Sequence, residues 1–203
     1  MSMLLSDMEL IPSPLNYIGG KYKLLPQLLL LFPKINGTFI DLFCGGCNVG
    51  INVKSSRTVF NDTNADLINL YNTLKSLNKA VFFEMVDKII EKYNLSRSDL
   101  NGYDYYGCDS SGGLGSYNKE HYIQMRKDFN NHTNSDCYYY AMLYVMIVYS
   151  FNNQIRFNRE GKFNLPVGKR DYNANMQRKL SKFVDRIKNG NYVFTTMDFE
   201  KFD

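Results

Sequence analysis

The stretch Thr38-Phe39-Ile40-Asp41-Leu42-Phe43-Cys44-Gly45-Gly46 joins a short apolar run to a pair of glycines. A continuous apolar run of this length, followed directly by glycines, is typical of a buried parallel strand that ends in a tight turn. Glycines let the backbone approach a ligand that any Cβ atom would block. The turn therefore predicts a cofactor site, and because it is not Gly-x-Gly-x-x-Gly, a nucleotide-like cofactor fits it better than a dinucleotide.

The segments on either side of this stretch alternate between helical and strand patterns. We expect helices over residues 21–32, 47–54 and 64–77, and a second strand over residues 58–61. Pro33 ends the first helix, and Thr63 or Asn64 can cap the third. Strands and helices in this order predict an α/β doubly wound sheet.

Beyond residue 78 the pattern becomes helical. We expect helices over residues 79–94, 119–130, 136–151 and 175–188, a loop over 102–118 with Gly112, Gly113 and Gly115 as breakers, and a β-hairpin of residues 154–158 and 162–165. Residues 192–196 read as a strand again. The predicted organisation is a first part of an α/β core over 1–77, an insert over 78–190, and a return to an incomplete core over 191–203.

Three charged residues lie where a nucleotide-like cofactor would need them. Asp62 follows the second strand, 21 residues after Asp41, where a carboxylate can accept hydrogen bonds from ribose hydroxyls. Capping of the next helix is the alternative for Asp62. Lys21 and Lys23 lie at the expected start of a helix, where their charge opposes the helix dipole unless an anion binds there or the helix begins later.

Three motifs then occur together. They are Tyr-x-Gly-Gly-Lys-x-x-Leu-Leu at residues 17–25, Asp-Leu-Phe-Cys-Gly-Gly at 41–46, and Asn-Asp at 61–62. In order and spacing they resemble the Dam family of DNA adenine-N6 methyltransferases. The resemblance implies a Rossmann-like core that binds S-adenosylmethionine (AdoMet). It places these residues at the cofactor: Tyr17, Gly19, Lys21, Asp41, Phe43, Gly45, Asp62, Asp198 and Phe199. Asp198 would accept a hydrogen bond from the adenine amino group of AdoMet, with Phe199 beside the ring.

The predicted hairpin region is similar to the target-recognition hairpin of the same family. Residues 154–188 carry ten Lys or Arg against three Asp or Glu, a net charge of +7, which indicates either a phosphate-binding face or a solvated helix face. A hairpin fits the major groove of double-stranded DNA. The expected DNA contacts are Phe151, Asn153, Gln154, Arg156, Lys169 and Arg170. Packing of Phe151 in the core, and phosphate contacts rather than base contacts for Lys169 and Arg170, are the alternatives. The implied target is a short palindrome such as GATC.

One motif of the family is absent from the sequence. Transfer to adenine N6 needs an acceptor for the amine and a platform for the flipped base, which the family provides as Asp-Pro-Pro-Tyr. The five prolines here are Pro12, Pro14, Pro26, Pro33 and Pro166, and no two are adjacent. No catalytic residue is therefore assigned. We expect a C-terminally truncated and inactive chain, one subunit of a split enzyme whose second chain carries the motif, or a DNA-binding remnant.

The composition of the chain excludes several classes of protein. No apolar run reaches the roughly 18 residues of a membrane span, and residues 1–15 lack the basic region of a secretory signal, so we expect a cytoplasmic protein. The four cysteines form no zinc set, and no metal is expected. Cys44-Gly45-Gly46-Cys47 also fits a thiol redox motif. That alternative leaves the other motifs and the basic region unexplained.

Overall fold

The computed structural model of the chain describes residues 9–17 and 19–202, which form two compact units. The first unit comprises Met1–Pro14, Ile18–Lys75 and Lys179–Asp203, and the second comprises Leu15–Tyr17 and Ser76–Arg178. Residues 1–8, Ile18 and Asp203, which belong to the expected domains, lie outside the described residues.

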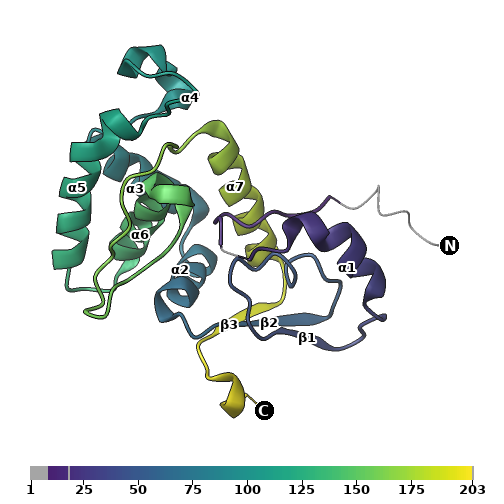
Figure 1. Cartoon of the computed structure of the whole chain (residues 1–203). Coiled ribbons are helices and arrows are strands. Elements are labelled where there is room, and N and C mark those ends of the chain that lie inside the picture. Colours follow the sequence, from purple (N-terminus) through teal and green to yellow (C-terminus); the bar gives the residue numbers. More distant parts are fainter. Residues whose placement is uncertain (1–8, 18, 203) are drawn as a thin grey trace. The chain divides into compact units, whose positions relative to one another are not determined.

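The first unit is built on a parallel sheet (Figure 1). Its strands are β1 (Thr38–Asp41), β2 (Arg57–Asn61) and β3 (Tyr192–Thr195), in the order β1-β2-β3. Asp41 pairs with Phe60, and Asn61 pairs with Thr195. All three strands run in the same direction, so their carboxyl ends meet at one edge of the sheet. The predicted α/β class with a parallel sheet is confirmed.

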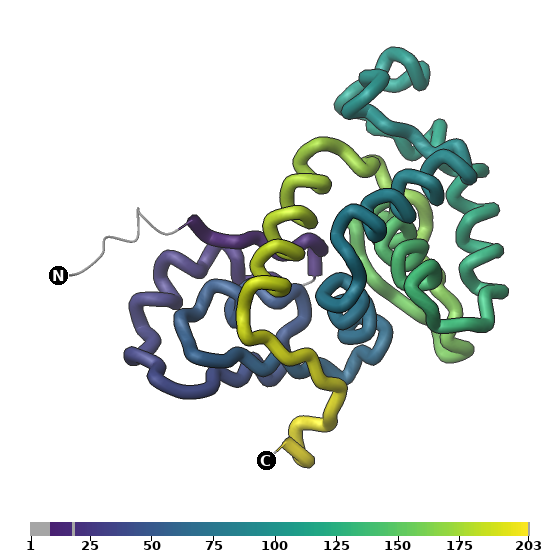
Figure 2. Tube along the Cα trace, turned by 180° about the vertical axis from the view of Figure 1, so that it is seen from behind, coloured from purple at the N-terminus to yellow at the C-terminus, as the bar shows by residue number. Residues whose placement is uncertain are grey.

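Aromatic side chains fill the core beside this sheet. The rings of Phe60 and Phe194 stack with centroids 5.0 Å apart, and Tyr71 of α2 (Ala65–Ser76) lies 5.4 Å from Phe194. Phe183 lies 5.5 Å from Tyr71. It belongs to α7 (Ala174–Asn189), which leads directly into β3 (Figure 2). Full burial of one such ring stabilises the fold by about 1.5–3 kcal/mol.

Two predicted helices of the first unit need correction. The helix expected over 21–32 is a 3₁₀ turn, η2 (Tyr22–Leu24), followed by α1 (Leu25–Leu31). The helix expected over 47–54 is wrong, since residues 48–52 form turns. Cys47 has a left-handed φ of 59°, and the N–H of Gly50 donates to the Asp41 carboxylate at 2.9 Å. The left-handed conformation of Cys47 is not that of a right-handed helix, so a regular helix cannot begin there.

The second unit is helical. It contains α3 (Lys79–Lys92), α4 (Ser98–Asn101), η3 (Asp104–Tyr106), α5 (Gly115–Asn131), α6 (Cys137–Tyr149) and η4 (Phe151–Asn153). The expected helices are confirmed to within a few residues at their ends. The loop expected over 102–118 is shorter than predicted and is interrupted by a 3₁₀ turn. It contains η3, and α5 already begins at Gly115 because the Leu114 N–H is held by the Lys169 carbonyl at 2.9 Å.

Helix α6 is the core of the second unit. All its residues from Tyr140 to Tyr149 are buried, as expected for a helix that is apolar on every side. It packs against α3 and α5. Asp136 accepts a hydrogen bond from the Tyr139 N–H at 2.8 Å and caps the helix.

The predicted hairpin forms isolated antiparallel bridges rather than two strands. Phe157 pairs with Phe163, and Ser150 pairs with Val167. Between Phe157 and Phe163 the chain turns at Gly161, whose φ is 72° and whose N–H donates to the Asn158 carbonyl at 3.0 Å.

Candidate cofactor and nucleic-acid site

The glycine turn after β1 is closed onto the end of β2. The Cys44 N–H donates to the Asn61 carbonyl at 2.8 Å, and the Gly45 N–H donates to the Asp62 Oδ2 atom at 3.0 Å. The Tyr71 hydroxyl donates to the Gly45 carbonyl at 2.9 Å. Gly45 has a positive φ of 45°, which favours glycine. Two strand ends and helix α2 therefore hold the turn in one conformation.

Asp62 has a role that differs from a simple helix cap. Its Oδ1 atom accepts from the Asn64 N–H at 3.0 Å, while Asn64 itself caps the helix by accepting from the Leu67 N–H at 3.1 Å. Each carboxylate oxygen has two lone pairs, so Asp62 keeps acceptor capacity for a ligand. Its half-buried carboxylate lies at the carboxyl edge of the sheet, as expected for a ribose-binding acid.

Asp41 lies beside the same turn. Its Oδ2 atom accepts from the Gly50 N–H at 2.9 Å, and a Cβ atom at Gly50 would lie 2.5 Å from the Phe60 ring and 2.9 Å from that oxygen. Burial raises the pKa of the Asp41 carboxyl, the Gly50 N–H opposes that shift, and the nearby Asp62 charge adds to it. Asp41 therefore fixes the backbone after the glycine turn, and only glycine fits at residue 50.

Asn61 joins the three strand ends, a role that the sequence analysis did not assign. Its side-chain N–H₂ donates to the carbonyls of Leu42 (3.2 Å) and Met197 (3.0 Å). Its Oδ1 atom accepts from the Met197 N–H and the Thr195 hydroxyl, both at 3.0 Å. Asn61 thereby fixes the segment that carries Asp198. The only sequence signal was its place in the Asn-Asp pair.

Phe43 and Phe199 form an exposed aromatic pair at this edge. Their ring centroids lie 5.6 Å apart, and the residues are 69% and 51% exposed. Asp198 accepts from the Glu200 N–H at 3.1 Å and so caps η5 (Phe199–Lys201). The structure thus brings six of the predicted cofactor residues to the carboxyl edge of the sheet or its adjoining loops: Asp41, Phe43, Gly45, Asp62, Asp198 and Phe199.

The remaining predicted cofactor residues precede α1. Lys21 is exposed and lies before η2, and Gly19 has a positive φ of 77°. Lys21 is the N-cap residue of η2, which runs directly into α1, so Lys21 and Lys23 lie at the start of a helical segment. Tyr17 is half-buried and belongs to the second unit.

The two neighbouring thiols do not have the surroundings of a redox motif. Cys44 is 7% exposed and Cys47 is fully buried. Burial raises the pKa of the Cys47 thiol well above its ordinary value. A redox thiol needs the opposite shift, because the thiolate is the nucleophile.

In the second unit, the segment after α6 carries the predicted nucleic-acid contacts. Phe151 is 51% exposed, so it is not a core residue. Asn153 is only 2% exposed, and its amide is used within the fold: it donates to the Val148 carbonyl and accepts from the Asn16 amide at 3.1 Å. Asn152 is exposed with a φ of 56°, and the sequence analysis missed it.

The cations among the predicted DNA contacts lie on the surface of this unit. Arg156 is exposed and donates from Nε to the Asn164 side chain at 2.8 Å, and Lys169 and Arg170 are exposed. Gln154 is half-buried. A cavity of about 470 Å³ lies within the second unit, and its lining consists of Asn16, Ser150, Phe151, Asn152, Asn153, Lys169 and Arg170. Amides, an aromatic ring and two cations therefore share one hollow.

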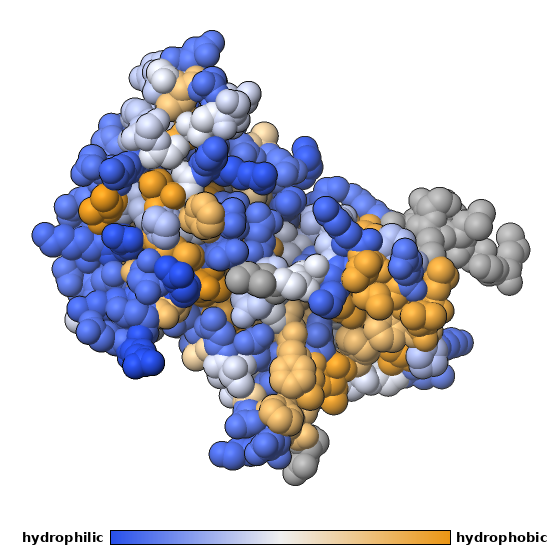
Figure 3. Space-filling model, in the orientation of Figure 1, coloured by the Kyte–Doolittle hydropathy of each residue, from blue (hydrophilic) through white to orange (hydrophobic). Residues whose placement is uncertain are grey.

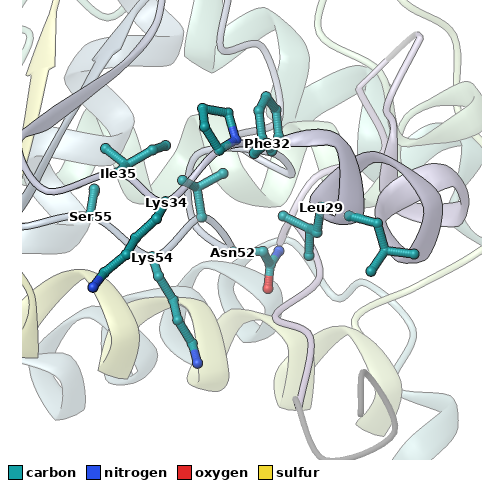
Figure 4. Close-up of a pocket in the computed structure, with 10 residues that line it drawn as sticks. Leu29, Phe32, Lys34, Ile35, Asn52, Lys54 and Ser55 are labelled. Atoms are coloured by element: carbon teal, nitrogen blue, oxygen red, sulfur yellow. The ribbon is translucent and has the colours of Figure 1, made fainter. Parts of the chain in front are cut away.

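A second cavity, of about 530 Å³, lies beside α1 in the first unit (Figure 4). Leu29, Phe32 and Ile35 supply apolar lining, and Lys34 and Lys54 project to the same side. Exposed apolar side chains continue over α1 (Figure 3), with Leu30 69% and Leu31 79% exposed. None of the predicted site residues lines this cavity.

Within the described part of the chain, no helix combines the length and apolar character needed to cross a membrane.

Comparison with known proteins supplies the remaining observation. Residues 17–203 match the family described as D12 class N6 adenine-specific DNA methyltransferase. The chain is 34% identical to Modification methylase StsI of Streptococcus sanguinis, covering 98% of this chain and 27% of that protein. It is 33% identical to Type II methyltransferase M.FokI of Planomicrobium okeanokoites, covering 95% and 26%.

A shorter relative matches at lower identity. DNA adenine methylase of Escherichia coli K12 is 26% identical, covering 86% of this chain and 54% of that protein. The chain therefore spans about a quarter of the length of the first two relatives and about half that of the third.

Proposed function

The chain belongs to the D12 class of N6 adenine-specific DNA methyltransferases, and on that premise we propose that it forms the cofactor-binding and DNA-reading part of such an enzyme. The proposed reaction is methyl transfer from AdoMet to adenine N6 in a short duplex site. The observation that carries the proposal is the closure of the glycine turn onto Asp62 at the carboxyl edge of the sheet. Two relatives are named as a modification methylase and a type II methyltransferase, so we propose a modification role.

The residues at the sheet edge suit AdoMet. Asp62 would accept from the ribose hydroxyls, and Asp198 from the adenine amino group. Phe43 and Phe199 offer exposed ring faces for the adenine. Gly45 leaves room for close approach to the backbone, and Lys21 would complete the site at the methionine end. When bound, AdoMet would supply the methyl group from its sulfonium centre.

The second unit would hold the DNA. Lys169 and Arg170 are exposed cations suited to phosphates, and Arg156 has the fork geometry that reads guanine. Phe151 is exposed enough to enter a base stack. We assign amide contacts to Asn152 and Gln154, because Asn153 is buried and its amide is used within the fold. Duplex DNA containing GATC is the first substrate to test.

We further propose that these 203 residues alone do not transfer the methyl group. The sequence has no adjacent prolines and so lacks Asp-Pro-Pro-Tyr. A further polypeptide segment or a second chain would supply it. The 203 residues would then contribute cofactor binding and DNA binding.

The test separates binding from transfer. AdoMet binding is measured by isothermal titration calorimetry, DNA binding by fluorescence anisotropy, and transfer with labelled AdoMet on a GATC duplex and on random duplex DNA. We expect both kinds of binding and no label on adenine. Label on adenine would show that another residue holds the amine. Binding of DNA without AdoMet would favour a DNA-binding protein without a cofactor.

A matched control identifies the cofactor site. Asp62→Asn removes one charge at the sheet edge, whereas Glu84→Gln removes one from an exposed side chain of α3. Only the first change should weaken AdoMet binding. Equal effects of the two would contradict the assignment of the site.

A further inference from the structure

The glycine-rich turn after η3 packs tightly against the proposed DNA-contact segment. The Leu114 N–H donates to the Lys169 carbonyl at 2.9 Å. A Cβ atom at Gly113 would lie 2.6 Å from both the Lys169 Cβ and the Lys169 carbonyl oxygen. One at Gly115 would lie 2.9 Å from the Gly168 carbonyl oxygen. Two of the three glycines therefore touch the backbone that carries Lys169.

The same backbone also packs closely against the end of α6. The Gly168 N–H donates to the Tyr149 carbonyl at 2.7 Å, and a Cβ atom at Gly168 would collide with the carbonyl of Ser150. The segment from Gly168 to Lys169 thus contacts two other pieces of backbone, the glycine-rich turn and the end of α6. It has no room to move toward either of them.

The turn is itself held in shape by one side chain. The Asp109 carboxylate accepts from the Ser111 N–H at 2.8 Å and from the Gly112 N–H at 2.7 Å, and these bonds lower the pKa of Asp109. Ser111 also presents its carbonyl to the Lys169 ammonium at 3.4 Å. The turn therefore touches both the backbone and the side chain of Lys169.

A buried carboxylate holds the other end of the segment. Asp171 is fully buried and accepts from the Ser98 hydroxyl at 2.8 Å and from the Ser98 N–H. Lys169 and Arg170 lie between this anchor and the glycine turn. Their side chains are exposed, while the backbone before and after them is held by hydrogen bonds.

We propose that Gly113 is a positioning residue for DNA binding, which by its missing side chain lets the turn Asp109–Leu114 seat the backbone that presents Lys169 and Arg170 to the phosphates. The inference rests on the proposed function, in which these two cations contact DNA. A fixed backbone reduces the ordering that the two cations must undergo on binding. Gly113 acts through Lys169 and needs no contact with DNA.

Three alanine substitutions separate steric contact from backbone strain. Gly113→Ala adds a Cβ atom against Lys169 at a φ of +76°. Gly107→Ala adds one at a φ of +62° with nothing within 4 Å, so it reproduces the strain alone. Gly112→Ala adds one whose closest neighbour is 3.6 Å away, without a positive φ. Binding of each variant to a GATC duplex is measured by fluorescence anisotropy from low to high salt.

The slope of log K against log salt is the decisive readout, because it counts the phosphates that the protein contacts. Each phosphate lost reduces the slope by about 0.9, so loss of both contacts reduces it by about 1.8 and weakens binding about 10-fold or more at moderate salt. We expect that result for Gly113→Ala only. An unchanged slope in Gly113→Ala, or an equal fall in Gly107→Ala, would overturn the proposal.

A second pair of variants tests the turn without adding a side chain. Asp109→Ala removes both the charge and the acceptor, whereas Asp109→Asn removes the charge and keeps an acceptor for the Ser111 and Gly112 N–H groups. We expect the alanine variant to bind DNA with a smaller slope than the asparagine variant. Identical slopes for these two would contradict the positioning role even if Gly113→Ala did not fold.

Direct removal of the cations distinguishes failure of this inference from failure of the proposed function. If Lys169→Ala and Arg170→Ala leave the slope unchanged, these residues do not contact DNA and the proposed function is wrong at this segment. If they reduce the slope and Gly113→Ala does not, the positioning role alone is wrong. If the cation variants and Gly113→Ala all reduce the slope, adding Gly113→Ala to the double variant Lys169→Ala/Arg170→Ala should reduce it no further.

Discussion

The Asp62 carboxylate accepts the Gly45 N–H at 3.0 Å, so the acid that follows β2 holds the glycine turn that follows β1. The same carboxylate accepts the Asn64 N–H. One side chain thus joins the cofactor turn, the end of the central strand and the start of α2. Any ligand that binds the free lone pairs of Asp62 would find the turn already ordered.

Asp62→Ala should weaken AdoMet binding at least 10-fold, because a hydrogen bond to a charged group contributes about 1.5–3 kcal/mol and the turn also loses its anchor. Calorimetric titration with AdoMet measures the change. Asp62→Asn keeps one acceptor and should fall between the wild type and Asp62→Ala. If the alanine variant binds AdoMet as tightly as the wild type, Asp62 is not part of the cofactor site.

Loss of either exposed aromatic ring should weaken AdoMet binding without unfolding the protein. Phe43 and Phe199 are both more than half exposed, so truncation leaves no cavity in the core. An aromatic pair contributes about 0.5–1.5 kcal/mol, which predicts a loss of about 2- to 12-fold for Phe43→Ala or Phe199→Ala. Leu30→Ala, another exposed apolar residue of the first unit, is the control and should bind AdoMet as the wild type does.

Gly50→Ala should reduce the free energy of unfolding by about 1–3 kcal/mol, because the new methyl group would overlap the Phe60 ring and the Asp41 carboxylate. Urea denaturation followed by circular dichroism measures it. Gly37→Ala is the matched control, since nothing lies within 4 Å of a Cβ atom there. Equal stability of the two variants would show that the Gly50 contact is not as tight as described.

The Cys47 thiol should resist alkylation in the folded protein. Burial raises its pKa, so the reactive thiolate is scarce at neutral pH, whereas Cys137 is exposed. Mass spectrometry after brief iodoacetamide treatment should find Cys137 modified first and Cys47 modified only after denaturation. Rapid modification of Cys47 at pH 7 would support the alternative of a thiol redox motif.

Asp171→Asn should change how stability depends on pH. Burial raises the pKa of Asp171 above the ordinary value of about 3.9, so the folded state holds this proton more strongly than the unfolded state. Its contribution to stability is therefore fully present below about pH 4 and is lost as the pH rises through the folded pKa. In Asp171→Asn this loss of stability with rising pH should be absent. The free energy of unfolding of both proteins, measured from pH 3 to 8, tests this prediction. If it depends on pH equally in both, burial does not raise the pKa of Asp171.

Local patterns predicted much of the fold correctly. The strand at Thr38–Asp41, the second strand, and α3, α5 and α6 of the second unit follow from local apolar patterns, which neighbouring residues in the chain determine. The same patterns failed over 47–54, where Cys47 adopts a left-handed conformation that a right-handed helix does not contain. They failed again at Gly115, where α5 begins earlier than its sequence indicates because Lys169 holds the preceding N–H.

The sequence by itself determined the α/β class, the glycine turn and the place of Asp62 after a strand, because each of these depends on residues adjacent along the chain. Only the tertiary structure decided that Asn61 joins three strand ends, that Asn153 is buried while Asn152 is exposed, and that Gly113 touches Lys169. These depend on contacts between residues tens of positions apart. A short window of sequence does not contain both partners, so folding alone decides which polar groups remain free for a ligand.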